Sequence, residues 1–498
     1  MKYVLGIDIG TGSTKAIALS LDLEPISVSQ FHYPTCSALP GYSEQNPGLI
    51  FEACLKSLQE TLDQLGDSPL AICFSSAMHS LVPVDLQGNK LHDMMTWADL
   101  RSDAIASRLI NSAEGAGIYE TTSMPLHAMS PLCKIIWIRE NMPGLFYETH
   151  KFLSIKEYIW FKIFGEYRID HSLASATGMF DIFRLKWSAP ILEVSGINVD
   201  HLSHPVSTSY SGEGIGSLGK LVKGLSANTP VIIGASDGCL ANLGSFALEM
   251  GIAALTIGTS GAVRIASNKP LIDQASMTFS YCLDENTFIC GGPVNNGGNV
   301  LQWLVRDFLG ETPDGQSFKE LFNRVETIKA GSEGLLFLPY LNGERAPIWD
   351  AKSCGTFFGI KTKHTRSHFS RAVIEGISYA LNDVLLAVTK NSTEIKQINV
   401  SGGFVNSKTW MQILADITGK RLSLIHTEDA SAIGAGFMAM KYLGLNEGNY
   451  PAAPGNKLGR VIEPDMNNHA IYRRNFVIFK QLYSNLKDTM HQLNLIGY

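Results

Sequence analysis

Hydrophobic and polar positions follow a strand-like pattern at two widely separated places along the chain. Residues 2–9 alternate in the manner of a strand, and an apolar pattern resumes in residues 15–21, directly after a glycine-rich stretch. A turn between two antiparallel strands fits this stretch better than a strand-to-helix loop. Residues 251–267, GIAALTIGTSGAVRIAS, again put Gly-Thr between two apolar runs. Because the two predicted hairpins lie about 250 residues apart, we expect a duplicated chain.

Helical and strand-like patterns alternate between the hairpins. The predicted helices cover residues 47–65, 131–141 and 156–164, and the predicted strands cover residues 70–77 and 230–238. Helices and strands are thus mixed in this region of the chain.

The second half shows the order strand, glycine turn and helix twice. Residues 288–310 have this order and precede a predicted strand at 335–340, and residues 398–419 repeat it. Residues 430–444, ASAIGAGFMAMKYLG, predict a helix of small side chains that can pack closely against a backbone or a ligand.

The length of the chain bounds the number of domains. With 498 residues it is too long for one hydrophobic core, so we expect two or three domains. No low-complexity linker marks a boundary, and the repeat alone places it near residues 245–250, which gives an N-terminal domain of residues 1–246 and a C-terminal domain of residues 247–498.

Composition and charge narrow the class of protein. Hydrophobic residues make up 45% and charged residues 17%, which is typical of a globular chain. The formal net charge is -6 and the basic residues are scattered, which argues against nucleic acid or an anionic membrane as the main partner. The 8 cysteines lie far apart without a CxxC pair, and no run of about 18 apolar residues occurs. These features predict reduced thiols and a cytoplasmic protein.

The first glycine-rich turn, in GIDIGTGSTKA (residues 6–16), fits neither of two common phosphate-binding patterns. A P-loop needs four residues between its first two glycines, whereas Gly6 and Gly10 enclose three, and a dinucleotide loop needs a third glycine where Lys15 stands. Small residues still let backbone N–H groups approach anionic oxygens closely. Asp8 would repel the same phosphates unless a Mg²⁺ ion stood between them. The alternative is an ordinary tight hairpin with a solvated aspartate.

Six segments in a fixed order carry a resemblance to a known family. Residues 129–141, MSPLCKIIWIREN, and residues 355–375, GTFFGIKTKHTRSHFSRAVIE, resemble the two signatures of the FGGY family of carbohydrate kinases, and the likeness extends over essentially the whole chain. The other four segments are DIGTGSTK, GASDG, TIGTSG and VSGGFVNS. The resemblance implies an α/β fold class, with two ribonuclease-H-like domains of the actin and Hsp70 ATPase type around a central cleft that holds Mg-ATP and a sugar.

The resemblance also implies roles for residues in both hairpins. In the first turn it implies that Asp8 lies near Mg²⁺ and that ATP phosphates are bound by Gly10, Thr11, Gly12, Ser13, Thr14 and Lys15. In the second half it implies a second phosphate turn and an adenosine-binding turn, formed by Gly258, Thr259, Ser260, Gly298, Gly402, Gly403 and Asn406. Arg345 lies in LPYLNGERAPIWD, which also resembles a family element, and its role is left open.

Asp237 is the predicted proton acceptor. Transfer of a γ-phosphoryl group to a sugar hydroxyl needs a group that takes the hydroxyl proton. A carboxylate at the end of the apolar strand in GASDG, next to Gly238, is both rigid and approachable. The alternative is an aspartate that caps the helix that follows.

The predicted sugar wall consists of two segments that follow strands. Met78 and His79 come after the strand of residues 70–77, and Trp97, Asp99 and Arg101 lie together in TWADLRS. Trp offers a flat apolar face, while Asp and Arg offer an acceptor and a fork of donors. A lone histidine is more often structural, and Arg101 is alternatively a buried ion-pair partner of Asp99.

Within the family, segments such as FSSAMHSLVPVD and GGPVNNGG are similar to the branch that acts on gluconate. We therefore expect ATP-dependent phosphorylation of D-gluconate to 6-phospho-D-gluconate, with Arg101 and His79 as candidates for binding its carboxylate. The alternatives are another acceptor of the same family, such as xylulose or glycerol, and an actin- or Hsp70-like ATPase switch. The expected partner is a small-molecule sugar or sugar acid, and a homodimer is plausible by analogy.

Overall fold

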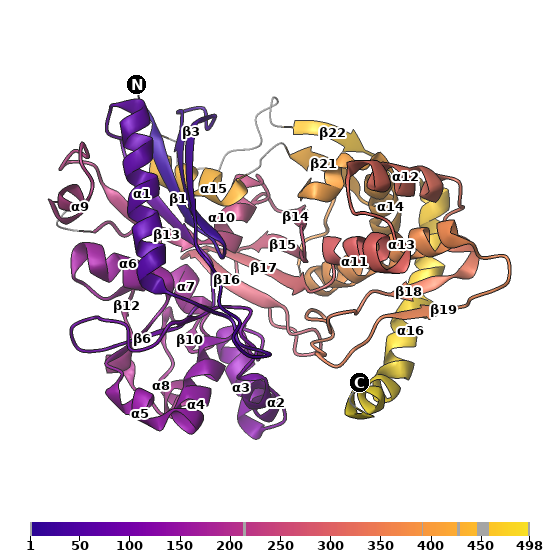
Figure 1. Cartoon of the computed structure of the whole chain (residues 1–498), viewed down its shortest axis with the longest axis horizontal. Helices are drawn as coiled ribbons and strands as arrows, with labels where there is room; N and C mark the ends of the chain where they lie inside the picture. The colour runs from indigo at the N-terminus through magenta and orange to yellow at the C-terminus, as the bar shows by residue number, and fades with distance from the viewer. Residues whose placement is uncertain (1, 213–215, 391, 426–428, 446–457, 497–498) are drawn as a thin grey trace.

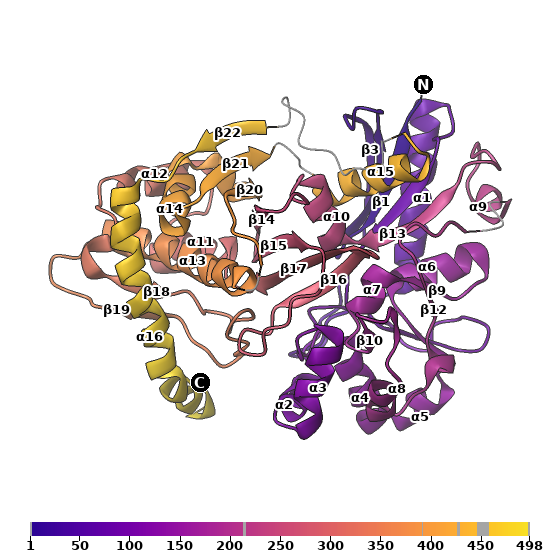
Figure 2. The same ribbon diagram turned by 180° about the vertical axis from the view of Figure 1, so that it is seen from behind.

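The computed structural model describes residues 2–212, 216–390, 392–425, 429–445 and 458–496 of the chain. Two α/β halves lie side by side, the N-terminal half on the left of Figure 1 and the C-terminal half on the right. Figure 2 shows the same two halves from behind.

The sheet of the N-terminal half has the order β13-β5-β1-β2-β3. Its strands are β1 Val4–Ile9, β2 Ser13–Leu19, β3 Pro25–His32, β5 Ile72–Ser76 and β13 Val231–Ser236. The strands β1, β2 and β3 form an antiparallel meander, and β5 and β13 continue the sheet in parallel with β1. The predicted first hairpin and the predicted strands at 70–77 and 230–238 are therefore confirmed.

The larger sheet of the C-terminal half has the order β16-β17-β15-β14-β20-β21-β22. Its strands are β14 Ile252–Ile257, β15 Gly261–Ser267, β16 Phe279–Asp284, β17 Thr287–Val294, β20 Gln397–Ser401, β21 Arg421–Ile425 and β22 Leu458–Ile462. Again three antiparallel strands, β14, β15 and β17, are extended by two strands, β20 and β21, parallel to β14. The order β3-β2-β1-β5-β13 thus matches β17-β15-β14-β20-β21, which confirms the predicted duplication.

The helices surround both sheets. In the N-terminal half they are α1 Pro47–Leu65, α2 Asp103–Ile110, α3 Ala113–Thr122, α4 Pro131–Asn141, α5 Pro143–Glu148, α6 Ile155–Phe164, α7 His171–Ser175, α8 Ala189–Ser195, α9 Gly216–Leu221 and α10 Asp237–Gly244. In the C-terminal half they are α11 Gly298–Trp303, α12 Gly315–Glu326, α13 Arg366–Thr389, α14 Lys408–Thr418, α15 Ala430–Tyr442 and α16 Met466–Ile496. Short strands complete the fold: β4 Glu44–Gln45, β6 Val82–Val84, β7 Met94–Met95, β8 Lys151–Leu153, β9 Arg168–Asp170, β10 Phe180–Asp181, β11 Lys186–Trp187, β12 His204–Val206, β18 Leu336–Leu338 and β19 Thr356–Phe358.

Local sequence explains where the best-predicted helices begin and end. Helix α1 begins after Asn46, whose side chain accepts a hydrogen bond from the N–H of Gly48, and ends at Gly66 in the left-handed conformation. Helix α6 begins with a capping box between Ser154 and Glu157. These signals account for the agreement between the predicted and observed helices.

Helix α13 is long and apolar enough to cross a membrane, yet 83% of its most apolar window is buried inside the protein. It packs against β15, β17 and β18 as a core helix. All 8 cysteines have free thiols.

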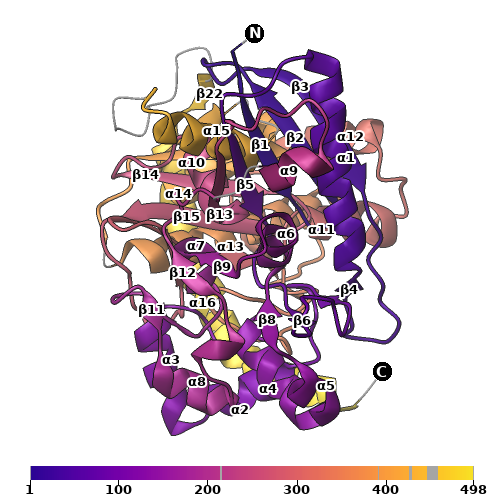
Figure 3. The same ribbon diagram turned by 90° about the vertical axis from the view of Figure 1, so that its left-hand side faces the viewer.

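Helix α15 of the second half packs on the sheet of the first half. It contacts α10, β1 and β5, and the views in Figures 1 and 2 place it beside α10 and β1. Its small residues explain the close approach, because a Cβ added to Gly434 would lie 2.1 Å from the carbonyl oxygen of Leu240. The side view in Figure 3 also shows α15 next to α10, near β1. The two halves are thus joined by a tightly packed helix pair as well as by the chain.

Candidate active site

Two adjoining cavities lie between and beside the glycine turns. The larger, of about 590 Å³, is lined by the C-terminal half, and the smaller, of about 360 Å³, is lined by both halves. Both volumes suit small-molecule ligands. Gly258 and Thr259 line both cavities. The turn between β14 and β15 therefore lies between the two cavities, at the point where a ligand in one cavity would approach a ligand in the other.

The neighbouring Gly298 is packed directly against the backbone of that turn. The N–H of Gly258 donates to the carbonyl of Ser260 at 2.9 Å, and the N–H of Gly298 donates to the carbonyl of Gly258 at 2.8 Å. A Cβ added to Gly298 would lie 2.6 Å from that carbonyl oxygen. Ser260 lines only the smaller cavity, and Gly298 only the larger one.

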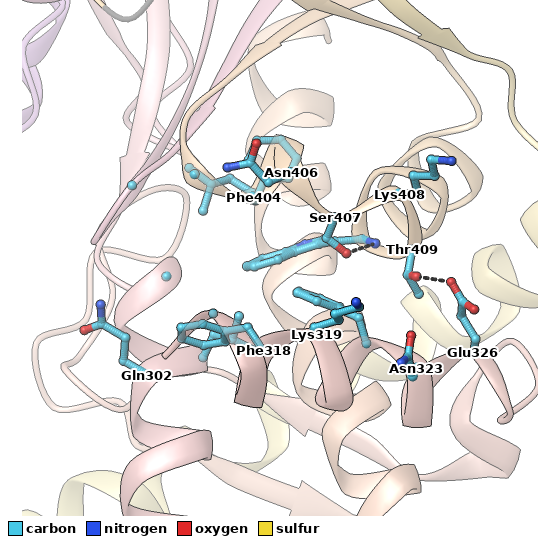
Figure 4. A pocket seen from close by; sticks show the side chains of 18 of the residues that line it. Gln302, Phe318, Lys319, Asn323, Glu326, Phe404, Asn406, Ser407, Lys408 and Thr409 are labelled. Atoms are coloured by element: carbon cyan, nitrogen blue, oxygen red, sulfur yellow. Dashed lines mark hydrogen bonds between the residues drawn. The ribbon is translucent and has the colours of Figure 1, made fainter. Parts of the chain in front are cut away.

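The larger cavity has an aromatic and amide lining suited to a nucleoside. Figure 4 shows Phe404 and Asn406 on one side of it and Phe318 and Lys319 on the other. Gly403 also lines it. Gly402, just before, has φ 106° and a Cβ there would lie 2.2 Å from the carbonyl oxygen of Ile257, so this residue shapes the turn rather than lining the cavity.

The first turn, between β1 and β2, is closed by a bond from the N–H of Gly10 to the carbonyl of Ser13 at 3.0 Å. Thr11 lines the smaller cavity. Thr14 is buried beside the hydroxyl of Tyr33, and Lys15 forms an ion pair with Asp429. Gly12 has open space around its Cβ position.

Asp8 is held by hydroxyl groups from both halves. Ser75 donates to one carboxylate oxygen at 2.7 Å, and Ser431 on α15 donates to the other at 2.8 Å. Burial raises the pKa of Asp8, and the nearby Asp429 raises it further. An ionised Asp8 is therefore favoured when a cation lies close to it.

A divalent cation at Asp8 would need ligands from outside the protein. The described part of the chain has no group of three or more His, Cys, Asp or Glu side chains that could hold a metal ion. Mg²⁺ suits such a place, because it is usually bound through one or two carboxylates together with waters and phosphates of the substrate. The residues present thus fit Mg²⁺ that arrives with a phosphate ligand.

Asp237 lines the smaller cavity at the end of β13, as the first residue of α10. Ser236 caps that helix, since its hydroxyl accepts a hydrogen bond from the N–H of Cys239. The carboxylate of Asp237 is therefore not used as the cap, and it accepts only the N–H of Gly238, at 2.6 Å, among the described hydrogen bonds. Burial and the nearby Asp8 raise the pKa of Asp237 to about 7, which suits a general base.

Three of the predicted sugar-wall residues, Met78, His79 and Trp97, line the smaller cavity. The ring of His79 is held by the carbonyl of Ala176 at 2.9 Å and faces the hydroxyl of Tyr281 at 3.4 Å. Burial and the charge of Lys134 lower the pKa of His79 to about 3. His79 is therefore a neutral ring at physiological pH and supplies no positive charge to a substrate.

Arg101 and Asp99 differ from the sequence-based expectation. The guanidinium of Arg101 pairs with Asp99 at 2.9 Å and with Glu44 at 2.6 Å, and it stacks over the ring of Tyr42. The side chain is 4% exposed, and neither residue is among the described residues that line the smaller cavity. Two carboxylates already neutralise Arg101, so the alternative interpretation of a buried ion pair describes it correctly.

Lys134, in the first family signature, holds the sugar wall from behind. Its ammonium group donates to the carbonyl of His79 at 2.5 Å and to the carbonyl of Thr96 at 2.6 Å. Lys134 is fully buried, and burial lowers its pKa to about 7. One side chain thus fixes the backbone at both segments of the wall.

Two cavity residues escaped the sequence analysis as substrate contacts. Arg264 on β15 and Arg345 both line the smaller cavity, together with Tyr281. The signal for Arg264 was an arginine inside the otherwise apolar strand AVRIA. Arg345 lies over the ring of Trp97, 5.6 Å from its centre, and is 8% exposed.

Comparison with known proteins agrees with this architecture. Residues 3–244 match the N-terminal domain, and residues 253–442 the C-terminal domain, of the FGGY family of carbohydrate kinases. The chain is 40% identical over 445 residues to the gluconokinase of Bacillus licheniformis, with 87% of this chain and 86% of that protein covered. The gluconate kinase and the xylulose kinase from Lactobacillus acidophilus both superpose with a TM-score of 0.93 at 32% identity, over 99% of this chain and 99% and 100% of theirs.

Proposed function

The chain belongs to the FGGY family of carbohydrate kinases, and we propose that within this family it phosphorylates D-gluconate to 6-phospho-D-gluconate. The observation that carries the proposal is the higher identity with a gluconokinase than with a xylulose kinase. The charge of the smaller cavity agrees with it, because two guanidinium groups and one carboxylate line that cavity. Such a surplus of positive charge favours an anionic acceptor.

The two cavities divide the ligands between them. Kinases of this family use ATP, and the aromatic and amide lining of the larger cavity suits its adenosine. The shared turn at Gly258 and Thr259 then receives the phosphates, and the acceptor occupies the smaller cavity. The reacting hydroxyl and the γ-phosphoryl group meet beside that turn.

Asp237 is the proposed general base. It takes the proton of the terminal hydroxyl as that oxygen forms its bond to the γ-phosphorus and the bond from this phosphorus to the bridging oxygen of ADP breaks. The carboxylate sits at the first turn of α10, where its backbone is fixed. Its raised pKa gives it the proton affinity that this role needs.

Asp8 is the proposed protein contact to Mg²⁺. The ion would neutralise phosphate charge when it is bound with ATP. Ser75 and Ser431 orient the Asp8 carboxylate, and Lys15 and Asp429 pair beside it. Chelation of Mg²⁺ should abolish turnover, and added Mg²⁺ should restore it.

A neutral ketopentose such as xylulose is the second candidate acceptor. The observation in its favour is that the gluconate kinase and the xylulose kinase of Lactobacillus acidophilus superpose on this chain with the same TM-score. The fold therefore does not distinguish the two acceptors. The choice between acceptors then rests on a few side chains of the smaller cavity. We place the reaction in the cytoplasm.

The test is to identify the acceptor and the position of phosphorylation. Purified protein with Mg-ATP should release ADP in the presence of D-gluconate. Phosphorus NMR of the product should show a phosphoryl group coupled to the two protons at C6. ADP release that needs no sugar would instead support an ATPase switch, and release with xylulose alone would support the second candidate.

A further inference from the structure

The smaller cavity holds more positive than negative charge. Among the described residues that line it, Arg264 and Arg345 are cationic and Asp237 is acidic. The ring of His79 adds no charge, because its pKa is lowered to about 3. Burial lowers the pKa of both guanidinium groups, and the charge of Arg264 lowers the pKa of Arg345 further. An anion in this cavity would relieve that cost.

Arg345 lies at the end of the smaller cavity that is next to the two glycine turns. One of its terminal nitrogens donates to the carbonyl of Val294 at 3.1 Å, and Val294 pairs with Gly261 at the start of β15. Its guanidinium also lies over Trp97, whose indole N–H donates to Thr11 in the first turn. The contacts of Arg345 are therefore with residues next to both glycine turns.

Arg264 lies farther along the same strand. It is four residues beyond Ser260, which puts its backbone about 13 Å from the second turn in an extended strand. Ala262 and Arg264 both line the cavity, as expected for residues two apart on one face of β15. On the opposite wall its Nε lies 3.6 Å from the Cβ position of Gly238, beside Asp237 and Met78.

The N–H donors of Arg264 have no hydrogen-bond partner in the part of the chain that the structure describes. Its guanidinium has no hydrogen bond, and no carboxylate within 4.0 Å, among the residues that the structure describes. Asp237 favours its charge from a greater distance. A guanidinium offers five N–H donors in a fork that matches a carboxylate. A half-buried arginine whose donors have no partner among the described residues is suited to an anionic ligand rather than to a structural role.

We propose that Arg264 binds the carboxylate of a sugar-acid acceptor and thereby selects aldonates over neutral sugars. The inference rests on the proposed function and adds the residue that distinguishes an anionic acceptor from a neutral one. In this arrangement Asp237 receives the reactive hydroxyl, and Arg264, which contacts the neighbouring Gly238 from the opposite wall, binds the carboxylate of an acceptor that lies between the two walls.

The test compares D-gluconate with D-gluconamide, in which a neutral amide replaces the carboxylate and every hydroxyl is kept. The parent enzyme should prefer gluconate in kcat/KM. Arg264→Leu should lose about 10- to 100-fold in kcat/KM for gluconate, mainly through KM, and change little for gluconamide. Arg264→Lys, which keeps a charge without the fork, should fall between the two. Arg108→Leu removes an exposed arginine outside both cavities and should leave the ratio unchanged.

Three controls make the outcome decisive. Thermal unfolding and binding of an ATP analogue show whether each variant folds, and calorimetric binding of gluconate without nucleotide gives a readout that is independent of turnover. Weaker gluconate binding by Arg264→Leu, at unchanged nucleotide binding, supports the proposal. Equal losses for gluconate and gluconamide would overturn it while leaving the gluconate assignment intact. A parent enzyme that prefers neutral sugars would overturn the assignment itself.

Discussion

The indole N–H of Trp97 donates a hydrogen bond to the hydroxyl of Thr11 at 2.9 Å. Trp97 belongs to the sugar wall, and Thr11 lies in the first glycine turn. The amide of Gln45 donates to the carbonyl of Thr11 at 2.5 Å and holds the same turn from the other side. The acceptor wall and the phosphate turn are therefore positioned by one shared contact.

Trp97→Phe keeps an aromatic face and removes this hydrogen bond. We expect kcat/KM for the acceptor to fall by about 2- to 10-fold, the usual net value of one hydrogen bond. Trp187→Phe is the matched control, because it removes an indole N–H that bonds to the carbonyl of Ser203, outside the smaller cavity. Steady-state kinetics measure kcat/KM for the acceptor in both variants. Equal losses of kcat/KM in the two variants would show that the Trp97 contact contributes to stability alone.

Asp237→Asn should fold and bind ATP like the parent while its turnover falls by about 10² to 10⁴. The amide cannot take the hydroxyl proton, yet it keeps the size of the side chain, and Ser236 still caps α10. Single-turnover kinetics with a nucleotide-binding assay measure both properties. A variant within a few-fold of the parent would mean that the proton leaves by another route.

The pH dependence follows from the pKa of Asp237, which burial raises to about 7. Because the base must be ionised to accept a proton, kcat/KM should fall about tenfold per pH unit below that value. Because folding raises this pKa from 3.8 to about 7, ionisation of Asp237 destabilises the fold progressively as the pH rises from about 4 to about 7. Asp237→Asn should therefore raise the unfolding temperature more at pH 8 than at pH 5. A rate profile that stays flat down to pH 5, with a constant difference in unfolding temperature, would contradict the pKa assignment.

Arg101→Leu should affect stability and leave acceptor preference unchanged. It leaves the buried carboxylate of Asp99 without its partner, which typically costs about 3–5 kcal/mol of unfolding free energy. Arg108→Leu breaks an exposed pair with Glu140 and should cost less than about 1 kcal/mol. Denaturant titration measures both. If the folded Arg101→Leu variant lost gluconate binding selectively, Arg101 would have to contact the substrate, which contradicts this prediction.

Much of the fold could be predicted because its signals are local. The two glycine hairpins, α1 from Pro47 to Leu65 and α4 from Pro131 to Asn141 depend on alternation, caps and turn residues close together in the sequence. The packing of α15 on the first sheet could not be predicted in this way. Its small residues indicated a close neighbour, but periodicity does not say which neighbour.

The site was less predictable than the fold for a related reason. Sequence proximity put Arg101 beside the sugar wall, but its charge is taken by Glu44, a residue on a distant segment. Arg264 lies on a strand of the other half and reaches the cavity only when the two halves come together. Which arginine is free depends on partners that lie far away in the sequence.

The central claim is the identity of the acceptor, and the most direct measurement is a ranking of kcat/KM by coupled ADP release for D-gluconate, D-xylulose and glycerol under one set of conditions. The account predicts that gluconate exceeds each neutral acceptor by at least about tenfold, the value of one charge-assisted contact. A higher kcat/KM for xylulose or glycerol than for gluconate would contradict it.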